Sequence, residues 1–222
     1  MDCIKCDNKN CPKSGFVHGR QRYVCKKCGY HFTVSLKSSA FRVDVKQEAL
    51  HLYLEGMGLR AIGRHLQVSH VSVYRWIRAF GQQTPALESP SAIDVVEMDE
   101  LHTYIGHKKL YCWVWIAVDR YGHRFIDFVL GTRGYSTGKL LWESVQEKTI
   151  RWVMSDHWKV YPQMIPSHQL RQSKKETYTV EGYNTRLRHG LARLKRNTLC
   201  YSKSWLMLHY SILLLMHKLN YT

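Results

Sequence analysis

The spacing of four cysteines near the N-terminus constrains the fold of this chain more than any other feature. Two residues separate Cys3 from Cys6 and Cys25 from Cys28, and eighteen residues lie between the two pairs. Such pairs supply four thiolates, the number that a closed tetrahedral zinc site requires. We therefore predict a zinc ribbon over residues 1–37. The zinc would be structural, because four cysteines leave no coordination position open for catalysis.

The remaining cysteines do not follow this pattern. The chain has seven cysteines, an odd number, and five of them lie in the first 28 residues. The N-terminal sequence does not resemble an export signal, so this clustering favours metal binding over disulfide bonds. Cys11 lies between the two pairs and could be either a substitute ligand or a bystander.

The net charge points to a polyanionic partner. Lys and Arg total 33 against 17 Asp and Glu, which gives a formal charge of +16. Such an excess favours a nucleic acid or an acidic membrane surface. The excess lies in two regions: residues 1–82 hold fourteen basic and five acidic residues, and residues 171–203 hold nine and two. Residues 83–170 hold nine and ten, so the basic flanks could bind phosphates while the central acids serve another purpose.

A membrane-spanning segment is not expected. No uninterrupted apolar stretch reaches the ~18 residues of a spanning helix. Residues 204–221 come closest, but Ser, His and Lys interrupt them. This segment is predicted to be a buried amphipathic helix.

Residues 38–82 predict a helix-turn-helix domain that binds DNA. Apolar residues recur at helical spacing in three short segments, Gly56 and Gly58 would end the first helix, and Ser69 can cap the third. In this arrangement the final helix enters the DNA major groove. The residues predicted to point outward from it are His70, Ser72, Tyr74, Arg75 and Arg78.

The periodicity changes after a linker predicted at residues 83–93, which contains Pro85 and Pro90. Three β-rich runs separated by short turns predict three antiparallel strands. A helical pattern over 136–148 and a further apolar run then predict a crossover helix and a parallel fourth strand. This order is typical of a ribonuclease H-like core. We therefore predict an α/β fold in which residues 94–222 form a mixed-sheet catalytic domain after the zinc ribbon and the helix-turn-helix.

Two acids stand out on these strands. Asp99 lies within the first strand, and Asp156 ends the apolar run "IRWVMSD". A carboxylate at a buried strand end is costly unless it is paired or bound to metal. Glu97 shares a strand face with Asp99, whereas Glu100 points the other way.

The segment 179–197 is predicted to be a helix that carries a third acid. Glu181, Asn184 and Arg188 fall at i, i+3 and i+7 on one face, which could contact both metal and phosphate. A neighbouring face carries three leucines that can pack on the sheet. Gly190 weakens this helix by about 1 kcal/mol relative to Ala.

Taken together, these motifs resemble transposases of the insertion sequence 1 family of bacteria and archaea. The resemblance covers the whole chain, and its matching segments are "QRYVCKKCG", the helix-turn-helix, "EMDELHTYIG", "MSDHWKVY" and "VEGYNTRLRHGLARLKRNTLCYSKS". It implies a DDE-type enzyme whose catalytic triad is Asp99, Asp156 and Glu181. The family pattern has glycine after the second acid, where this chain has His157.

The resemblance also implies a reaction and its partners. The triad would bind Mg²⁺ or Mn²⁺, and two such ions would cleave the element ends and join the freed 3′-OH to target DNA. The N-terminal module would bind the terminal inverted repeats of double-stranded element DNA. Phosphates of the scissile strand would be positioned by Asn184, Arg188, Lys195 and Arg196. We further expect a homo-oligomer in the active complex and a cytoplasmic, nucleoid-associated protein.

Several alternatives stay open at the level of sequence. A DNA-binding regulator could keep the N-terminal module and use the second half for assembly, and a ribonuclease H-like repair nuclease would need no end-selective module. Glu97 could replace Asp99 as the first acid. Glu176 could replace Glu181, but we prefer Glu181 because it shares a helix face with Asn184. Glu176 is then expected to be a solvated charge that offsets the preceding lysines, Lys174 and Lys175.

Overall fold

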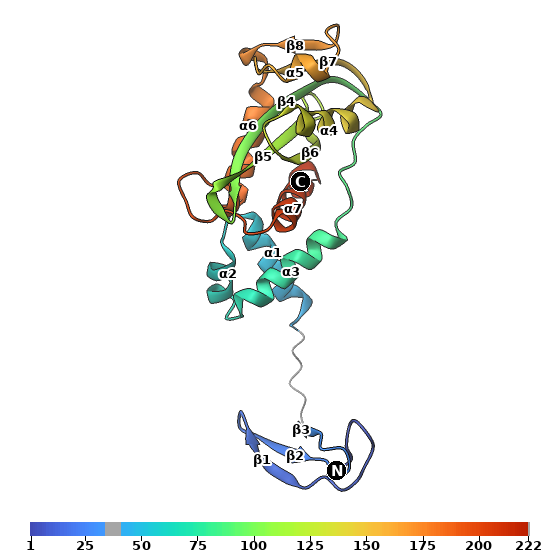
Figure 1. Ribbon diagram of the computed structural model, residues 1–222, viewed down its shortest axis with the longest axis vertical. Coiled ribbons are helices and arrows are strands. Elements are labelled where there is room, and N and C mark those ends of the chain that lie inside the picture. The colour runs from blue at the N-terminus through green and yellow to red at the C-terminus, as the bar shows by residue number, and fades with distance from the viewer. Residues whose placement is uncertain (34–40, 222) are drawn as a thin grey trace. The chain divides into compact units, whose positions relative to one another are not determined.

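The computed structural model describes residues 1–33 and 41–221 (Figure 1). The chain forms two compact units, Met1–Arg42 and Val43–Thr222. The predicted boundary between the zinc ribbon and the helix-turn-helix, at residues 37 and 38, lies outside the described residues. The finer domain boundaries stay a prediction.

The first unit is a small antiparallel sheet. Its strands are β1 (Lys13–Val17), β2 (Arg20–Val24) and β3 (His31–Thr33), in the order β1-β2-β3. His18 and Gly19 join the first two strands with φ angles of 47° and 73°. Positive φ at both positions is what a tight type I′ hairpin turn requires. The buried apolar cluster is small and consists of Cys3, Cys11, Cys25 and Phe32.

The second unit begins with the predicted helix-turn-helix. Its helices are α1 (Val43–Leu54), α2 (Leu59–His65) and α3 (His70–Gln83). Ser69 caps α3 as predicted, because its hydroxyl accepts the N–H of Val71 at 3.2 Å. A Cβ atom at Gly63 would lie 2.9 Å from the carbonyl oxygen of Val68. Glycine therefore permits the close approach of α2 to the turn before α3.

A five-stranded mixed sheet follows (Figure 1), which contains the four predicted strands and a fifth strand that was not predicted. The antiparallel strands β4 (Ala92–Ile105), β5 (His107–Asp119) and β6 (Arg124–Gly131) come first. After α4 (Tyr135–Gln146), the chain forms β7 (Thr149–Ser155) parallel to β4 and then the short β8 (Leu170–Gln172). The sheet order is β6-β5-β4-β7-β8. The connection between α3 and β4 is slightly shorter than the predicted linker, at residues 84–91.

Helices cover both faces of this sheet. On one face, α4 and α5 (Tyr161–Met164) pack in a cluster that includes Met98, Trp115 and Leu141. On the other face, α6 (Tyr178–Gly190) and α7 (Trp205–Tyr221) pack against Leu101 and Val114. The buried side chains of the helix-turn-helix belong to this second cluster. The helix-turn-helix and the mixed-sheet domain therefore share one core.

The helix predicted over 179–197 ends earlier than expected. Two 3₁₀ turns, η1 (Lys174–Glu176) and η2 (Ala192–Leu194), flank α6, which stops at Gly190. A Cβ atom at Gly190 would lie 2.7 Å from a Leu215 methyl and 3.1 Å from the carbonyl oxygen of Leu54. The chain turns where glycine allows this contact, so Lys195 and Arg196 do not continue the α6 stripe.

The described helices include none that is long and apolar enough to cross a bilayer. The C-terminal segment flagged for its hydrophobicity is α7, whose apolar side chains from Met207 to Met216 are buried in the protein core. Its hydrophobicity therefore reflects packing inside the protein.

Candidate active site

The parallel pairing of β4 with β7 places Asp99 beside Asp156. The register pairs Glu97 with Met154, and each aspartate lies two residues further along in the same direction. Side chains repeat their direction every two residues along extended chain. Asp156 follows the last residue of β7 directly, which brings its carboxylate to the strand end level with Asp99.

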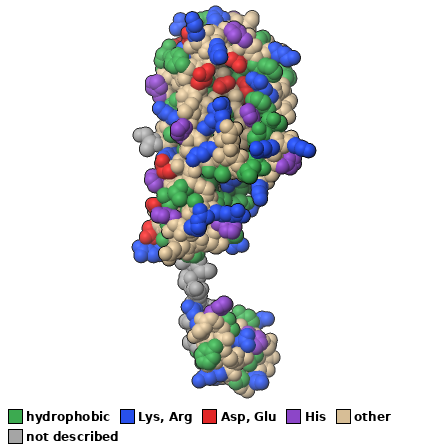
Figure 2. Space-filling model, turned by 90° about the vertical axis from the view of Figure 1, so that its left-hand side faces the viewer, with side chains coloured by type: hydrophobic (Ala, Val, Ile, Leu, Met, Phe, Trp, Pro, Cys, Tyr) green, Lys and Arg blue, Asp and Glu red, His purple; other side chains and the backbone are tan. Residues whose placement is uncertain are grey.

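The third acid comes from the first turn of α6. Glu181 is exposed, and its carboxylate accepts a hydrogen bond from the Thr177 hydroxyl at 3.4 Å. The three acids line a single pocket of about 370 Å³, whose lining residues are Asp99, Asp156, His157, Trp158, Lys174, Thr177 and Glu181. On the face of the larger unit shown in Figure 2, acidic side chains gather in one area with Lys and Arg around it. The structure thus brings together the acids of the predicted triad, while their roles stay a prediction.

The electrostatics of this pocket favour a cation. Burial raises the pKa of Asp99 to about 7, and the negative charges of Glu100, Asp156 and Glu181 contribute to the rise. A carboxylate surrounded by other carboxylates resists ionisation because like charges repel. A bound cation would offset this repulsion.

Asn184 connects α6 to the first acid. Its amide nitrogen donates to the Asp99 carboxylate at 2.7 Å, which fixes the orientation of that side chain. Its amide oxygen is buried and has no hydrogen-bond partner, and the same is true of the Arg188 Nε atom. Buried polar atoms are nearly always hydrogen-bonded in folded proteins. These two atoms, on the predicted helix stripe, therefore lack the partners that buried polar atoms normally have.

The two alternative acids, Glu97 and Glu176, both bind Arg120. Glu97 is fully buried and lies 2.6 Å from the Arg120 Nε atom; it also accepts the Val180 N–H at 2.8 Å. Glu176 pairs with the same guanidinium at 2.8 Å. The expectation that Glu176 offsets the neighbouring lysines is therefore wrong. Neither acid lines the pocket, and the network fixes the start of α6, which carries Glu181.

Glu100 is also paired, on the opposite face of β4. Its buried carboxylate accepts hydrogen bonds from Arg133 and from the Tyr161 hydroxyl, both at 2.8 Å. The Arg133 guanidinium lies between two indole rings, 4.7 Å from the centroid of Trp113 and 4.2 Å from that of Trp158. Because Trp158 lines the pocket, this arrangement supports one wall of the site.

The predicted DNA-reading residues on α3 differ in their exposure. His70, Arg75 and Arg78 are exposed on the surface of the helix. Ser72 and Tyr74 are half-buried, and Tyr74 packs against the hydrophobic core. The first three are therefore better placed to contact a DNA groove.

The basic residues after α6 lie apart from the acidic pocket. The ammonium of Lys195 reaches the carbonyl oxygen of Gly56 at 3.4 Å, and Arg196 is exposed beside His102 in a second pocket. Lys174 and Thr177 line the acidic pocket but were not among the predicted site residues. Thr177 precedes Glu181 by four residues, so extending the helix stripe backwards would have found it, but no periodicity marks Lys174.

The cysteine pairs meet as their spacing predicts. The sulfurs of Cys3, Cys6, Cys25 and Cys28 all lie within 4.8 Å of one another. Cys3 and Cys28 are 3.6 Å apart, as are Cys6 and Cys25. Zn–S bonds of about 2.3 Å place the sulfurs of a tetrahedral site about 3.8 Å apart, so the cluster fits zinc.

Cys11 is not a member of this cluster. Its thiol donates to the carbonyl oxygen of Asn8 at 3.2 Å, and the side chain is buried. The sequence left two alternatives open for Cys11, and the geometry favours the one in which Cys11 packs beside the zinc site without being a ligand.

Comparisons with known proteins agree with this architecture. The IS1 transposase family matches residues 92–221, and the homeodomain-like helix-turn-helix family matches residues 41–87. The InsB protein of insertion element IS1 4 from Escherichia coli K12 is 36% identical over 109 residues, which cover 49% of this chain and 65% of that protein. The InsB protein of IS1 from Shigella flexneri is 33% identical over 108 residues, covering 49% and 82%. The match therefore spans just under two thirds of the Escherichia coli relative.

A solved structure of lower similarity is the simian T-cell lymphotropic virus intasome in complex with PP2A regulatory subunit B56 gamma. It is 12% identical with a TM-score of 0.33, and the alignment covers 64% of this chain and 57% of that one. This similarity is too low to support a conclusion. The family match covers more than half of the chain and includes the acids of the candidate site, and the chain belongs to the IS1 transposase family.

Proposed function

We propose that this transposase binds the terminal inverted repeats of its insertion element, cleaves phosphodiester bonds at the element ends and joins the 3′-OH to target DNA. Three acids from separate parts of the chain line one pocket, and this observation carries the proposal. A structural or regulatory domain would have no need for such a concentration of carboxylates, which destabilise one another unless a cation binds.

The donor set of this pocket fits Mg²⁺ or Mn²⁺. Asp99, Asp156 and Glu181 offer carboxylate oxygens, and the buried Asn184 amide oxygen has no hydrogen-bond partner. Hard oxygen ligands of this kind suit Mg²⁺. In a two-ion site, the metals would activate the attacking oxygen and stabilise the leaving oxygen of an in-line displacement.

The protein side chains would orient the acids and the DNA strand. Asn184 holds the Asp99 carboxylate through its amide nitrogen. Lys174 lines the pocket, and the Arg188 guanidinium has a buried Nε–H that needs an acceptor. A phosphate oxygen is a strong acceptor for such groups. We infer that Lys174 and Arg188 hold the scissile strand while Asn184 keeps Asp99 in place.

End recognition would belong to the N-terminal part of the chain. The four cysteines would hold one zinc ion with a structural role, and α3 would present His70, Arg75 and Arg78 to the DNA. The relatives carry the names of insertion-element proteins, which agrees with this role.

The test is cleavage of DNA from the borders of the element that carries this gene. Purified full-length protein should nick these ends with Mg²⁺ and should lose activity with EDTA, and Asp99→Asn should lose activity while still binding the ends. The matched control for Asp99→Asn is Glu97→Gln, assayed at a temperature at which this variant stays folded. Glu97 lies two residues from Asp99 on the same strand and outside the pocket. Loss of cleavage in a folded Glu97→Gln protein, together with an active Asp99→Asn protein, would refute the metal site proposed here.

A further inference from the structure

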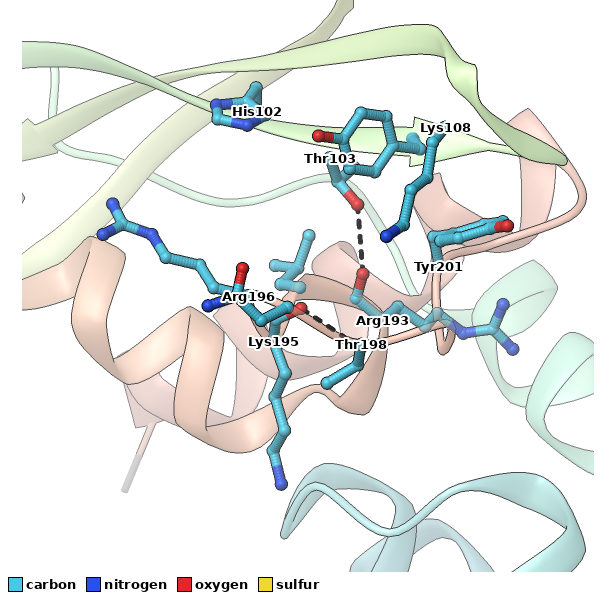
Figure 3. A pocket seen from close by; sticks show the side chains of 11 residues that line it. His102, Thr103, Lys108, Arg193, Lys195, Arg196, Thr198 and Tyr201 are labelled. Carbon is cyan, nitrogen blue, oxygen red and sulfur yellow. Dashed lines mark hydrogen bonds between the residues drawn. The ribbon is translucent and has the colours of Figure 1, made fainter.

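A second pocket, of about 340 Å³, is lined in part by residues that follow Asp99 on β4 (Figure 3). It is bounded by His102 to Tyr104 on β4, Lys108 at the start of β5 and residues 193–198 with Tyr201. Thr103, which lines this pocket, follows Asp99 by four residues and therefore points to the same face of β4, about 13 Å further along the strand. A DNA strand bound at Asp99 could therefore extend into this second pocket.

The second pocket is positively charged. Its lining includes no Asp or Glu. Lys108 and Arg196 have no ion-pair partner within the described ranges 1–33 and 41–221, so their charges are available to a ligand. The positive charges of Arg188, Arg196 and Arg133 also act on His102, whose pKa is lowered first by burial and then by these neighbours.

Two further cations at this pocket are engaged elsewhere. Figure 3 shows the side chains of Arg193 and Lys195 directed away from it. The Arg193 guanidinium donates to the Ser202 hydroxyl at 2.9 Å and to the Tyr53 hydroxyl. The Lys195 ammonium reaches the Gly56 carbonyl. These contacts fix the backbone of the loop, so that the pocket wall is held in place from the helix-turn-helix side.

Aromatic rings form another part of the wall. Tyr104 and Tyr201 both line the pocket, and their half-buried rings meet edge to face with centroids 5.9 Å apart. Tyr104 also contacts Tyr111 across the β4–β5 ladder, with centroids 5.0 Å apart. Ring packing of this kind holds the aromatic side chains in a fixed orientation before any ligand binds.

Cations beside aromatic rings are the combination that binds unpaired nucleotides. Bases stack on aromatic side chains while Lys and Arg contact the phosphates. In a duplex each base lies against its neighbours, so a pocket can take a base only if that base is unpaired or extruded. The acidic pocket and the second pocket follow one another along β4. Together they would accommodate a DNA strand that is cut in the acidic pocket and is unpaired a few nucleotides away.

We propose that this second pocket binds an unpaired DNA nucleotide near the scissile phosphate. Its base would stack on Tyr201, and Lys108 and Arg196 would contact its phosphates. The inference rests on the proposed function, because it takes the ligand to be the DNA strand that the acidic pocket cleaves. It adds that the element end must be locally unpaired when it is bound for cleavage.

Binding to two labelled DNA probes tests the inference without requiring cleavage. One probe is a blunt duplex, and the other is the same duplex with a single-stranded overhang that carries 2-aminopurine. In buffer without Mg²⁺, the full-length protein should bind the overhang probe roughly tenfold more tightly, as expected for one stacked base. Stacking in the pocket should also quench the 2-aminopurine fluorescence.

Variants of the pocket separate stacking from phosphate contact. Tyr201→Ala should abolish both the quenching and the tenfold preference, whereas Tyr201→Phe should keep them because the ring remains. Lys108→Gln should reduce affinity for the overhang probe. Lys109→Gln is the matched control, since Lys109 is the adjacent exposed cation that does not line the pocket, and it should leave the preference unchanged.

The outcomes distinguish this inference from the proposed function. Equal affinity of the wild-type protein for both probes, with Mg²⁺-dependent cleavage present, would overturn the pocket inference and leave the function intact. Equal losses in Lys108→Gln and Lys109→Gln would also overturn it. If the overhang preference and its loss in Tyr201→Ala are observed but cleavage is not, the pocket is supported and the proposed reaction fails.

Discussion

Two kinds of acid lie side by side on strand β4, and their surroundings differ in one respect. Glu97 and Glu100 are buried, and each is bound to an arginine, Arg120 or Arg133. Asp99 lies between them in sequence, but its neighbours in the pocket are Asp156 and Glu181, and its hydrogen-bond partner is the uncharged Asn184. Arginine side chains of the protein balance the charge of Glu97 and Glu100, whereas no arginine pairs with Asp99, Asp156 or Glu181 among the described residues.

This difference separates structural acids from candidate metal ligands. A buried ion pair is costly to break, because removing one partner leaves the other charge uncompensated. A group of unpaired carboxylates, by contrast, opposes its own ionisation and gains from an external cation. Substitutions should therefore affect stability at Glu97 and Glu100 but activity at Asp99, Asp156 and Glu181.

The largest effect is expected from a matched pair of substitutions around the start of α6. Glu181→Gln should lower end cleavage by a factor on the order of 10³ or more, because it removes a ligand from the acidic pocket. Glu176→Gln should keep near-normal cleavage, since Glu176 pairs with Arg120 outside the pocket. Both would be assayed in Mg²⁺ and in Mn²⁺. The reverse ranking would mean that the α6 stripe is a DNA-facing surface.

The next effect is a loss of stability. Glu97→Gln should lower the free energy of unfolding by about 3–5 kcal/mol, because it leaves Arg120 with one buried partner fewer. Chemical denaturation would measure it. Asp94→Asn is the control on the same strand, since Asp94 forms only an exposed pair with Arg151 at 3.6 Å, and its loss should cost less than about 1 kcal/mol. Equal stabilities for the two variants would contradict the role given to Glu97.

A smaller loss is expected on the other face of β4. Tyr161→Phe removes the hydroxyl that donates to Glu100, which should cost about 2 kcal/mol of stability. Cleavage should persist at temperatures where the variant is folded. Tyr135→Phe, at an exposed tyrosine, should be near neutral in the same thermal unfolding assay. Loss of cleavage in a folded Tyr161→Phe protein would show that Glu100 belongs to the reaction site.

The smallest effect concerns stability at the acidic pocket itself. Asp156→Asn should change the free energy of unfolding by less than about 0.5 kcal/mol without Mg²⁺, because Asp156 has no ion-pair partner in the described chain. Adding Mg²⁺ should raise the melting temperature of the wild-type protein, which a ligand specific to the folded state does, but not that of the variant. An equal Mg²⁺ response in both proteins would place the metal elsewhere.

Much of the fold could be predicted from local patterns. The cysteine spacing, the helical periodicity before the linker and the order of strands and helices each depend on residues close together in the chain. The Ser69 cap is likewise a local contact. The sequence placed the end of α6 at residue 197, beyond its actual end at Gly190. Gly190 packs closely against Leu215 and Leu54, which are distant in sequence, so local patterns do not predict this end.

The sequence by itself determined the cysteine cluster, the element order and the set of candidate acids. Only the tertiary structure decided which of those acids are paired. Arg120 contacts Glu97 and Glu176, which are 23 and 56 residues away in the sequence, and no sequence periodicity predicts such contacts. The parallel register of β4 and β7 likewise brings Asp99 to Asp156 across 57 positions of the printed sequence. Charge balance depends on neighbours in space. The sequence could therefore identify the candidate acids, but it could not distinguish those paired with arginine from the candidate metal ligands.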